Sequence, residues 1–200
     1  MSSTHNLLVE LFVEELPPKA LKKLGEAFAG NLAASLHSQG LAAADAAVAA
    51  FASPRRLAVQ IRGVVSKAAD RAVQQKLMPV TVALAADGQP TPALLKKLAA
   101  LGADASVVPQ LMRAPDGKAE ALFLDSLVPG ATLAEGLQKA LDETLAKLPI
   151  PKVMTYQLAD GWSDVRFVRP AHGLVALHGR DVVPVSVLGL KAGRTTRGHR

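Results

Sequence analysis

The sequence predicts an α+β fold: a mixed or antiparallel sheet with packed helices, beginning β-α-β-β and arranged as one domain or two subdomains. Three observations support this class. A short β-prone apolar run at 6–13 precedes a segment with one apolar helical stripe. Two β-capable runs then flank the turn-like string SPRR at 53–56. With 200 residues, half of them hydrophobic and few aromatic, the chain can bury a sizeable aliphatic core.

The first predicted strand and helix are separated by a double proline. Residues 6–13, NLLVELFV, are typical of a buried strand. Pro17 and Pro18 suit a helix start, because the first helical turn needs no backbone donor there. Gly40 is a natural helix stop. Between them, apolar side chains recur at spacings of three and four, which predicts one buried face: Leu21, Leu24, Phe28, Leu32 and Leu36.

Glu14 and Glu15 stand between this strand and this helix, and two interpretations are open. Negative charge is favoured beside the unpaired N–H groups of a helix N-terminus, so the two acids and the two prolines can form a structural motif. Paired acids beside a chain reversal can also form a catalytic pair. No His, Ser or Lys is spaced nearby to work with them, which favours the structural motif.

The middle of the chain continues with strands and a short helix. Residues 46–65 predict a hairpin, or a strand–bend–strand, whose bend exposes Arg55 and Arg56. TPALLKKLAALG, at 91–102, predicts a short helix, and AEALFLDSLV, at 119–128, predicts a strand.

The clearest helix is predicted over 131–148, where Thr132 and Glu135 have the spacing of a capping box. The last fifty residues change character, with two apolar β runs around a turn at 179–181. We therefore expect an N-terminal α+β domain over 1–149 and, over 150–200, the β-rich start of a second subdomain that is truncated at 200.

Composition and motifs exclude several kinds of chemistry. The chain has no cysteine, which rules out disulfides, thiolate zinc sites and a cysteine nucleophile. Neither the phosphate-cradling loop GxxxxGK nor the nucleophile motif GxSxG occurs. His172 and His178 flank a probable strand without a third ligand, so a core-edge or surface role is simpler than a zinc site.

The charge distribution favours a polyanion partner, with nucleic acid first. The net charge is +6, and the last ten residues carry Lys191, Arg194, Arg197 and Arg200 without an acid. A solvated tail is the alternative. The lone Trp162 could stack on bases together with Tyr156, although ordinary packing is the simpler role.

The N-terminus lacks the basic start and long apolar run of a signal peptide, and no run approaches 18 apolar residues. We expect a cytoplasmic protein.

Four short strings, taken together, resemble a known family. They are VELFVEELPPKAL at 9–21, FASPRRLAV at 51–59, LPIPK with RFVRPAHGLVAL within 148–177, and LGLKAGRTTRGHR at 188–200. In this order and spacing the chain resembles the N-terminal part of the beta subunit of two-subunit, heterotetrameric bacterial glycine–tRNA synthetases. The resemblance is weakest across 66–127. It departs at Phe12-Val13 and Met78-Pro79, where the family commonly has Gly-Thr and Gly-Pro.

This resemblance implies a part in a ligase that joins glycine to its tRNA with ATP and Mg²⁺. The alpha subunit of the family carries the catalytic core, so we expect ATP and Mg²⁺ there, no cofactor in this chain, and no activity from this fragment alone. The implied partners are the alpha subunit and glycine tRNA, with no DNA and no membrane. The family motifs and the basic composition give the tRNA-binding candidates Arg194, Arg197, His199, Arg200, Arg55 and Arg56.

Two further interpretations stay open. The string GRTTRGHR could be an arginine-anchored loop packed on another part of the subunit, and Arg55 and Arg56 could pair with acids such as Glu14 and Glu15 to hold the bend. The chain would then be a protein-interaction scaffold without RNA contact. A stand-alone enzyme of another class has no visible nucleophile–base pair or metal set to support it.

Overall fold

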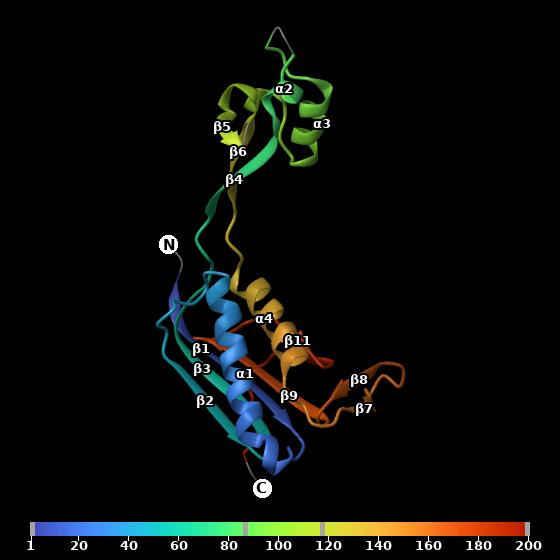
Figure 1. The fold of residues 1–200 in the computed structure, drawn as a ribbon. Coiled ribbons are helices and arrows are strands. Elements are labelled where there is room, and N and C mark those ends of the chain that lie inside the picture. Colours follow the sequence, from blue (N-terminus) through green and yellow to red (C-terminus); the bar gives the residue numbers. More distant parts are fainter. Residues whose placement is uncertain (1–2, 86–87, 117–118, 199–200) are drawn as a thin grey trace. The chain divides into compact units, whose positions relative to one another are not determined.

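A computed structural model describes residues 3–85, 88–116 and 119–198. The chain divides into two compact units, which Figure 1 shows as ribbons. The first unit consists of Met1–Ala69 and Gly130–Arg200, and the second of Asp70–Pro129. The second unit is therefore an insertion in the sequence of the first.

The first unit is built on a five-stranded antiparallel sheet in the order β10-β9-β1-β3-β2. In the centre, β1 pairs with β3 on one side and β9 on the other, so that Leu11 lies opposite both Leu57 and Leu174. This confirms the predicted α+β class and its β-α-β-β beginning. The strands are β1 (Thr4–Val13), β2 (Val48–Ser53), β3 (Arg56–Val65), β9 (Ala171–His178) and β10 (Asp181–Val182).

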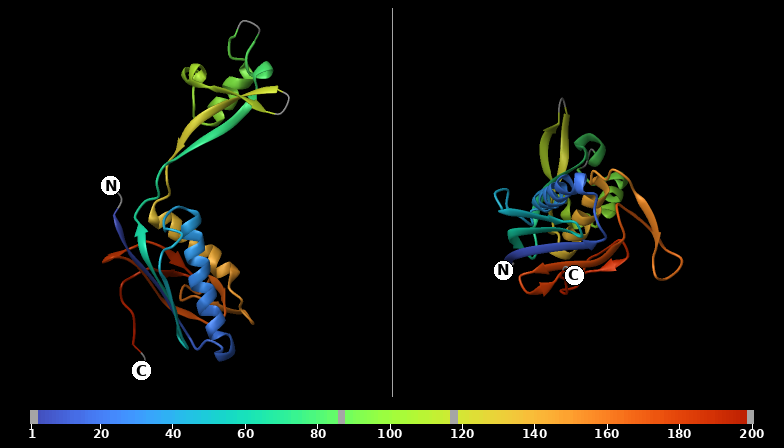
Figure 2. Two further views of the ribbon diagram at one scale, coloured as in Figure 1. Left: turned by 60° about the vertical axis from the view of Figure 1, so that its left-hand side comes forward. Right: turned by 90° about the horizontal axis from the view of Figure 1, so that it is seen from below.

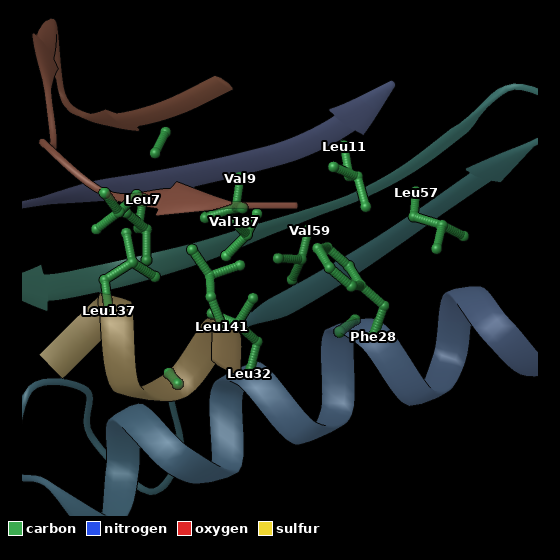
Figure 3. Close-up of a cluster of buried hydrophobic side chains, with 14 of the residues drawn as sticks. Leu7, Val9, Leu11, Phe28, Leu32, Leu57, Val59, Leu137, Leu141 and Val187 are labelled. Carbon is green, nitrogen blue, oxygen red and sulfur yellow. The ribbon is translucent and has the colours of Figure 1, made fainter. Parts of the chain in front are cut away.

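Two helices, α1 (Pro18–Ser38) and α4 (Leu133–Lys147), cover one face of this sheet (Figure 1). We call it the helix face and the opposite side the outer face. Figure 3 shows side chains of β1 directed toward both helices across the core. Burying a large aliphatic or aromatic side chain contributes about 1.5–3 kcal/mol, so this layer is a main source of stability. Its members include Leu7, Val9, Leu11, Phe28, Leu32, Leu137 and Leu141.

Both helices begin as the sequence predicts. Pro17 is the N-cap residue of α1, and Pro18 is its first residue. Past the end of α1, Gly40 has a φ of 73°, a conformation that glycine adopts without steric cost. The capping box of α4 is present: the N–H of Thr132 lies 3.0 Å from Glu135 Oε2, and the N–H of Glu135 lies 3.3 Å from Thr132 Oγ1.

We expect Thr132→Ala to lower the melting temperature more at neutral pH than in acid. Hydrogen bonds from the Thr132 hydroxyl, and then from its backbone N–H, hold the pKa of Glu135 below its ordinary value. A depressed pKa stabilises the fold at pH values above the unfolded pKa, about 4.3, and this contribution is lost as the pH falls through the folded pKa. Thermal melts of both proteins at pH 7 and at about pH 3 measure the difference. A melting-temperature gap that widens in acid would contradict this.

Two small hairpins complete the first unit. One joins β7 (Met154–Gln157) and β8 (Asp164–Phe167), and the other joins β11 (Ser186–Val187) and β12 (Leu190–Lys191). Among the helices of the described residues, none is long and apolar enough to cross a membrane.

The second unit has its own sheet and core. Its three antiparallel strands follow the order β4-β6-β5, with β4 at Arg71–Pro79, β6 at Ala119–Val128 and β5 at Met112–Asp116. The helix predicted over 91–102 is α3 (Pro92–Ala100), and it is accompanied by the short α2 (Val80–Ala83) and a 3₁₀ turn at Ala105–Gln110. The core includes Leu77, Leu94, Leu98 and Leu122.

The units do not divide at the boundary expected between 149 and 150. Residues 150–200 belong to the first unit because β9 pairs with β1 along its whole length. The sequence pattern changes near residue 150 because a helix is followed by strands. The pattern does not reveal which distant strand these later strands pair with. The second apolar run is also broken: β10 ends at Val182, and Pro184 has no N–H to continue a ladder.

Candidate functional site on the outer sheet face

The last described residues cross the outer face of the sheet, as the two views of Figure 2 show. The Gly193 N–H donates to the Leu174 carbonyl of β9 at 3.0 Å. Thr196 then donates its hydroxyl to the Glu10 carboxylate on β1, and Arg56 on β3 donates to the Arg197 carbonyl. The segment 193–197, which we call the crossing segment, therefore contacts three strands in turn.

Glu10 is the centre of these contacts. Its side chain is only 12% exposed although it carries a charge, and Arg56 Nε lies 3.4 Å from its Oε1. That Nε is buried and has no hydrogen-bond partner, so the Glu10–Arg56 interaction is one of charge at close range. The Arg56 guanidinium carbon also lies 6.0 Å from the centre of the Phe12 ring. Arg56 is thus held by an acid, an aromatic ring and a carbonyl.

A second set of contacts joins the strand–helix junction to the hairpin bend. The N–H groups of Val13 and Leu16 donate to the carbonyls of Arg55 and Pro54, at 2.9 and 2.6 Å. Arg55 Nη2 lies 3.6 Å from Glu15 Oε1, and both side chains are exposed. The bend and the junction are therefore fixed mainly by backbone bonds, and the exposed ion pair adds little.

The segment that leads into β9 is tied to the same junction. The N–H of Glu14 donates to the Pro170 carbonyl at 2.9 Å, and Arg169 Nε donates to the Glu15 carbonyl at 3.0 Å. His172 Nε2 lies 3.3 Å from Glu14 Oε1. Residues of all four family-like strings thus meet on one side of the unit, which sequence spacing alone did not reveal.

This geometry favours the structural interpretation of Glu14 and Glu15. Each acid has one exposed partner, and after Leu16 the chain enters α1 through its N-cap residue Pro17. Within the described ranges, no group of three or more potential metal ligands occurs. Glu10 was not among the predicted site residues, although it is the single charged residue in the apolar run at 7–13, which is the signal that could have identified it.

The predicted basic residues are brought together only in part. Arg56 donates to the Arg197 carbonyl, whereas the side chain of its chain neighbour Arg55 pairs with Glu15. Arg194 is exposed, and its Nη2 donates to the Arg180 carbonyl at the β9–β10 turn, at 3.1 Å. His199 and Arg200 lie outside the described residues.

The remaining histidine and the two aromatic candidates have different surroundings. His178 is buried, and its Nε2 lies 2.7 Å from the Val64 carbonyl, which fits a core-edge histidine. The Tyr156 hydroxyl accepts a hydrogen bond from the Ala171 N–H at 3.2 Å, and burial raises its pKa. Tyr156 therefore packs against the core, whereas Trp162 is 91% exposed.

Comparison with known proteins identifies the family of this chain. A family model described as the glycyl-tRNA synthetase beta subunit matches residues 7–200. The match places the chain in a family of aminoacyl-tRNA synthetase subunits. The chain belongs to the glycyl-tRNA synthetase beta subunit family.

Curated relatives carry the same description. The chain is 80% identical over 195 residues to the glycine–tRNA ligase beta subunit of Leptothrix cholodnii, covering 98% of this chain and 27% of the relative. It is 72% identical over 204 residues to that of Paracidovorax citrulli, covering 98% and 29%. It is 68% identical over 198 residues to that of a Janthinobacterium species, covering 99% and 28%. The chain thus spans between a quarter and a third of the length of these relatives.

Proposed function

We propose that this chain is the non-catalytic N-terminal part of a glycine–tRNA ligase beta subunit, that it contributes to tRNA binding, and that it assembles with the alpha subunit. The ligase would act in the cytoplasm, with ATP and Mg²⁺ bound by the alpha subunit. The crossing segment carries this proposal: it presents exposed arginines on a segment that contacts three strands of the sheet.

The arginines differ in whether their guanidinium groups are free to bind a phosphate. Arg56 already uses its guanidinium on Glu10 and on the Arg197 carbonyl, so its role is to position the crossing segment. Arg194 and Arg197 are exposed, as is Arg55, and a guanidinium can place two donors on one phosphate. We therefore assign tRNA contact to Arg194 and Arg197 first and to Arg55 second. His199 and Arg200 continue the same basic string and remain candidates.

Fluorescence anisotropy with labelled glycine tRNA tests the proposed contact. We expect salt-sensitive binding, and we expect Arg194→Ala/Arg197→Ala to weaken it about tenfold and to reduce the salt slope by about 2, one for each lost phosphate contact. Binding of an unrelated tRNA, measured alongside, shows how far the chain prefers glycine tRNA. The matched control is Lys19→Ala/Lys23→Ala, which removes two exposed charges from α1. The assignment is refuted if the arginine variant binds tRNA as tightly as the unsubstituted chain. It is also refuted if the lysine variant loses as much affinity as the arginine variant.

One observation favours a scaffold without RNA contact as the second candidate function. Arg56 and Arg194 both donate to backbone carbonyls of this chain, as expected of an arginine-anchored loop. Under that function, the chain co-elutes with the alpha subunit but shows no tRNA binding even at low salt.

A further inference from the structure

Two contacts of the crossing segment meet at one oxygen atom of Glu10. The Thr196 hydroxyl donates to Glu10 Oε1, and Arg56 Nε lies 3.4 Å from the same oxygen. Arg56 in turn donates to the Arg197 carbonyl. Glu10 therefore holds Thr196 directly and Arg197 through Arg56, although Glu10 and Thr196 are 186 residues apart in the sequence.

The surroundings of Glu10 leave its carboxylate little freedom to move. Its side chain is 12% exposed, and its backbone lies in the central strand β1, opposite Ala58 of β3 and Val175 of β9. The guanidinium of Arg56 is held close by, near the ring of Phe12. A segment that is tied to such a fixed group has less conformational freedom to lose when a ligand binds, so the ligand binds more tightly.

The backbone that carries the exposed arginines is fixed on both sides. The Gly193 N–H donates to β9 and the Thr196 hydroxyl donates to β1, so the two residues between them, which include Arg194, span two fixed points. Arg197 directly follows Thr196, and its own carbonyl accepts a hydrogen bond from β3. Both arginines are nevertheless exposed. The structure thus holds their backbone in place while it leaves their side chains open to a ligand.

We propose that Glu10 is a positioning residue for tRNA binding. It acts through Thr196 and Arg56, and it holds the exposed arginines of the crossing segment where they meet the phosphates. This inference rests on the tRNA contact proposed above and adds to it a largely buried acid that does not itself touch the RNA. By charge alone, a carboxylate near a phosphate weakens binding. An acid that strengthens tRNA binding therefore has to act through the arrangement of the segment.

The direction of the change in Glu10→Ala tests the inference in the full-length beta subunit, with fluorescence anisotropy of labelled glycine tRNA. We expect binding to weaken about fivefold, because the crossing segment then occupies its binding position only about a fifth of the time. The matched control, Glu26→Ala, removes the same charge from an exposed residue of α1 and should tighten binding slightly or leave it unchanged. A Glu10→Ala subunit that binds tRNA as tightly as the unsubstituted subunit, or more tightly, overturns the inference.

Substitutions of Thr196, which is exposed, test the same link without disturbing the sheet. Thr196→Val removes the hydroxyl that donates to Glu10 and should weaken tRNA binding about fivefold, whereas Thr196→Ser keeps a hydroxyl and should restore the affinity. The control Thr195→Val makes the same change in the neighbouring exposed threonine, and we expect an effect of less than about twofold. Melting temperatures confirm that the variants fold. Equal losses in the two valine variants contradict a positioning role for Glu10.

Two further readouts separate positioning from direct contact. The double variant Glu10→Ala/Thr196→Val should also bind about fivefold more weakly, because both changes break one link; losses that multiply would mean that the two residues act separately. The salt slope should stay unchanged, because the phosphate contacts are still made in the complex, and a slope that falls by about 2 would overturn the inference. If Arg194→Ala/Arg197→Ala leaves binding unchanged, the proposed tRNA contact fails and this inference fails with it. If only the arginine variant weakens binding, the contact stands and the positioning role is refuted.

Discussion

Replacing Gly130 with alanine is expected to lower the free energy of unfolding of the first unit by about 3 kcal/mol. A Cβ at this position would lie 2.0 Å from the Ala68 carbonyl oxygen and 2.7 Å from that of Ala69. Both neighbours are backbone atoms, so no side chain can rotate away to make room. The Ala68 N–H also donates to the Ala131 carbonyl at 2.9 Å, which fixes the two segments at this approach.

The matched control is Gly30→Ala, within α1. A Cβ at Gly30 has no atom within 4 Å, and alanine is favoured over glycine inside a helix by about 0.5–1 kcal/mol. Urea titrations of the three proteins give the free energies of unfolding. The two substitutions should change the free energy of unfolding in opposite directions. A Gly130→Ala protein as stable as the unsubstituted chain would show that the segments at 68–69 and 130 do not approach this closely.

We expect Arg56→Ala to reduce stability by about 2 kcal/mol. The change leaves the charge of Glu10 buried without its arginine, and it removes the donor to the Arg197 carbonyl. It also removes the guanidinium from the Phe12 ring. Truncating one partner of a largely buried ion pair costs more than the pair contributes, because the remaining charge is left without compensation.

Arg55→Ala, one residue earlier in the same bend, is the control. Its ion pair with Glu15 is exposed on both sides, so its loss should cost less than about 0.5 kcal/mol. Denaturant titrations again measure both effects. Because Arg56 holds the crossing segment, limited proteolysis within 193–197 should quicken in Arg56→Ala and not in Arg55→Ala. If Arg56→Ala and Arg55→Ala lost the same stability, the two arginines would have equivalent surroundings, which would contradict the contacts described above.

The elements that could be predicted from the sequence are those with local signals. The strand at 6–13, the helix opened by Pro17 and Pro18, and the capping box of Thr132 all depend on residues close in sequence. The hairpin around the SPRR bend is present as β2 and β3. Periodicity, proline and cap chemistry act over a few residues, so they can be recognised in one chain.

What could not be predicted depends on distant pairings. The place of β9 beside β1 is set by the whole core, and it brings residues 150–200 into the first unit. Arg55 pairs with Glu15, as the sequence suggested, but the partner of Arg56 is Glu10, on the strand that pairs with β3. The inserted second unit has no strong composition change at its borders, although the Pro129-Gly130 pair offered a weak one.

The insertion of one unit within the other has a consequence for how the protein is made. Synthesis proceeds from the N-terminus, so Asp70–Pro129 is complete before the ribosome has added β9. Until then β1 has a neighbour only in β3, and its other side presents unpaired backbone groups to the surroundings. In a nascent or shortened chain that stops before Ala171, the central strand of the finished sheet is itself an edge.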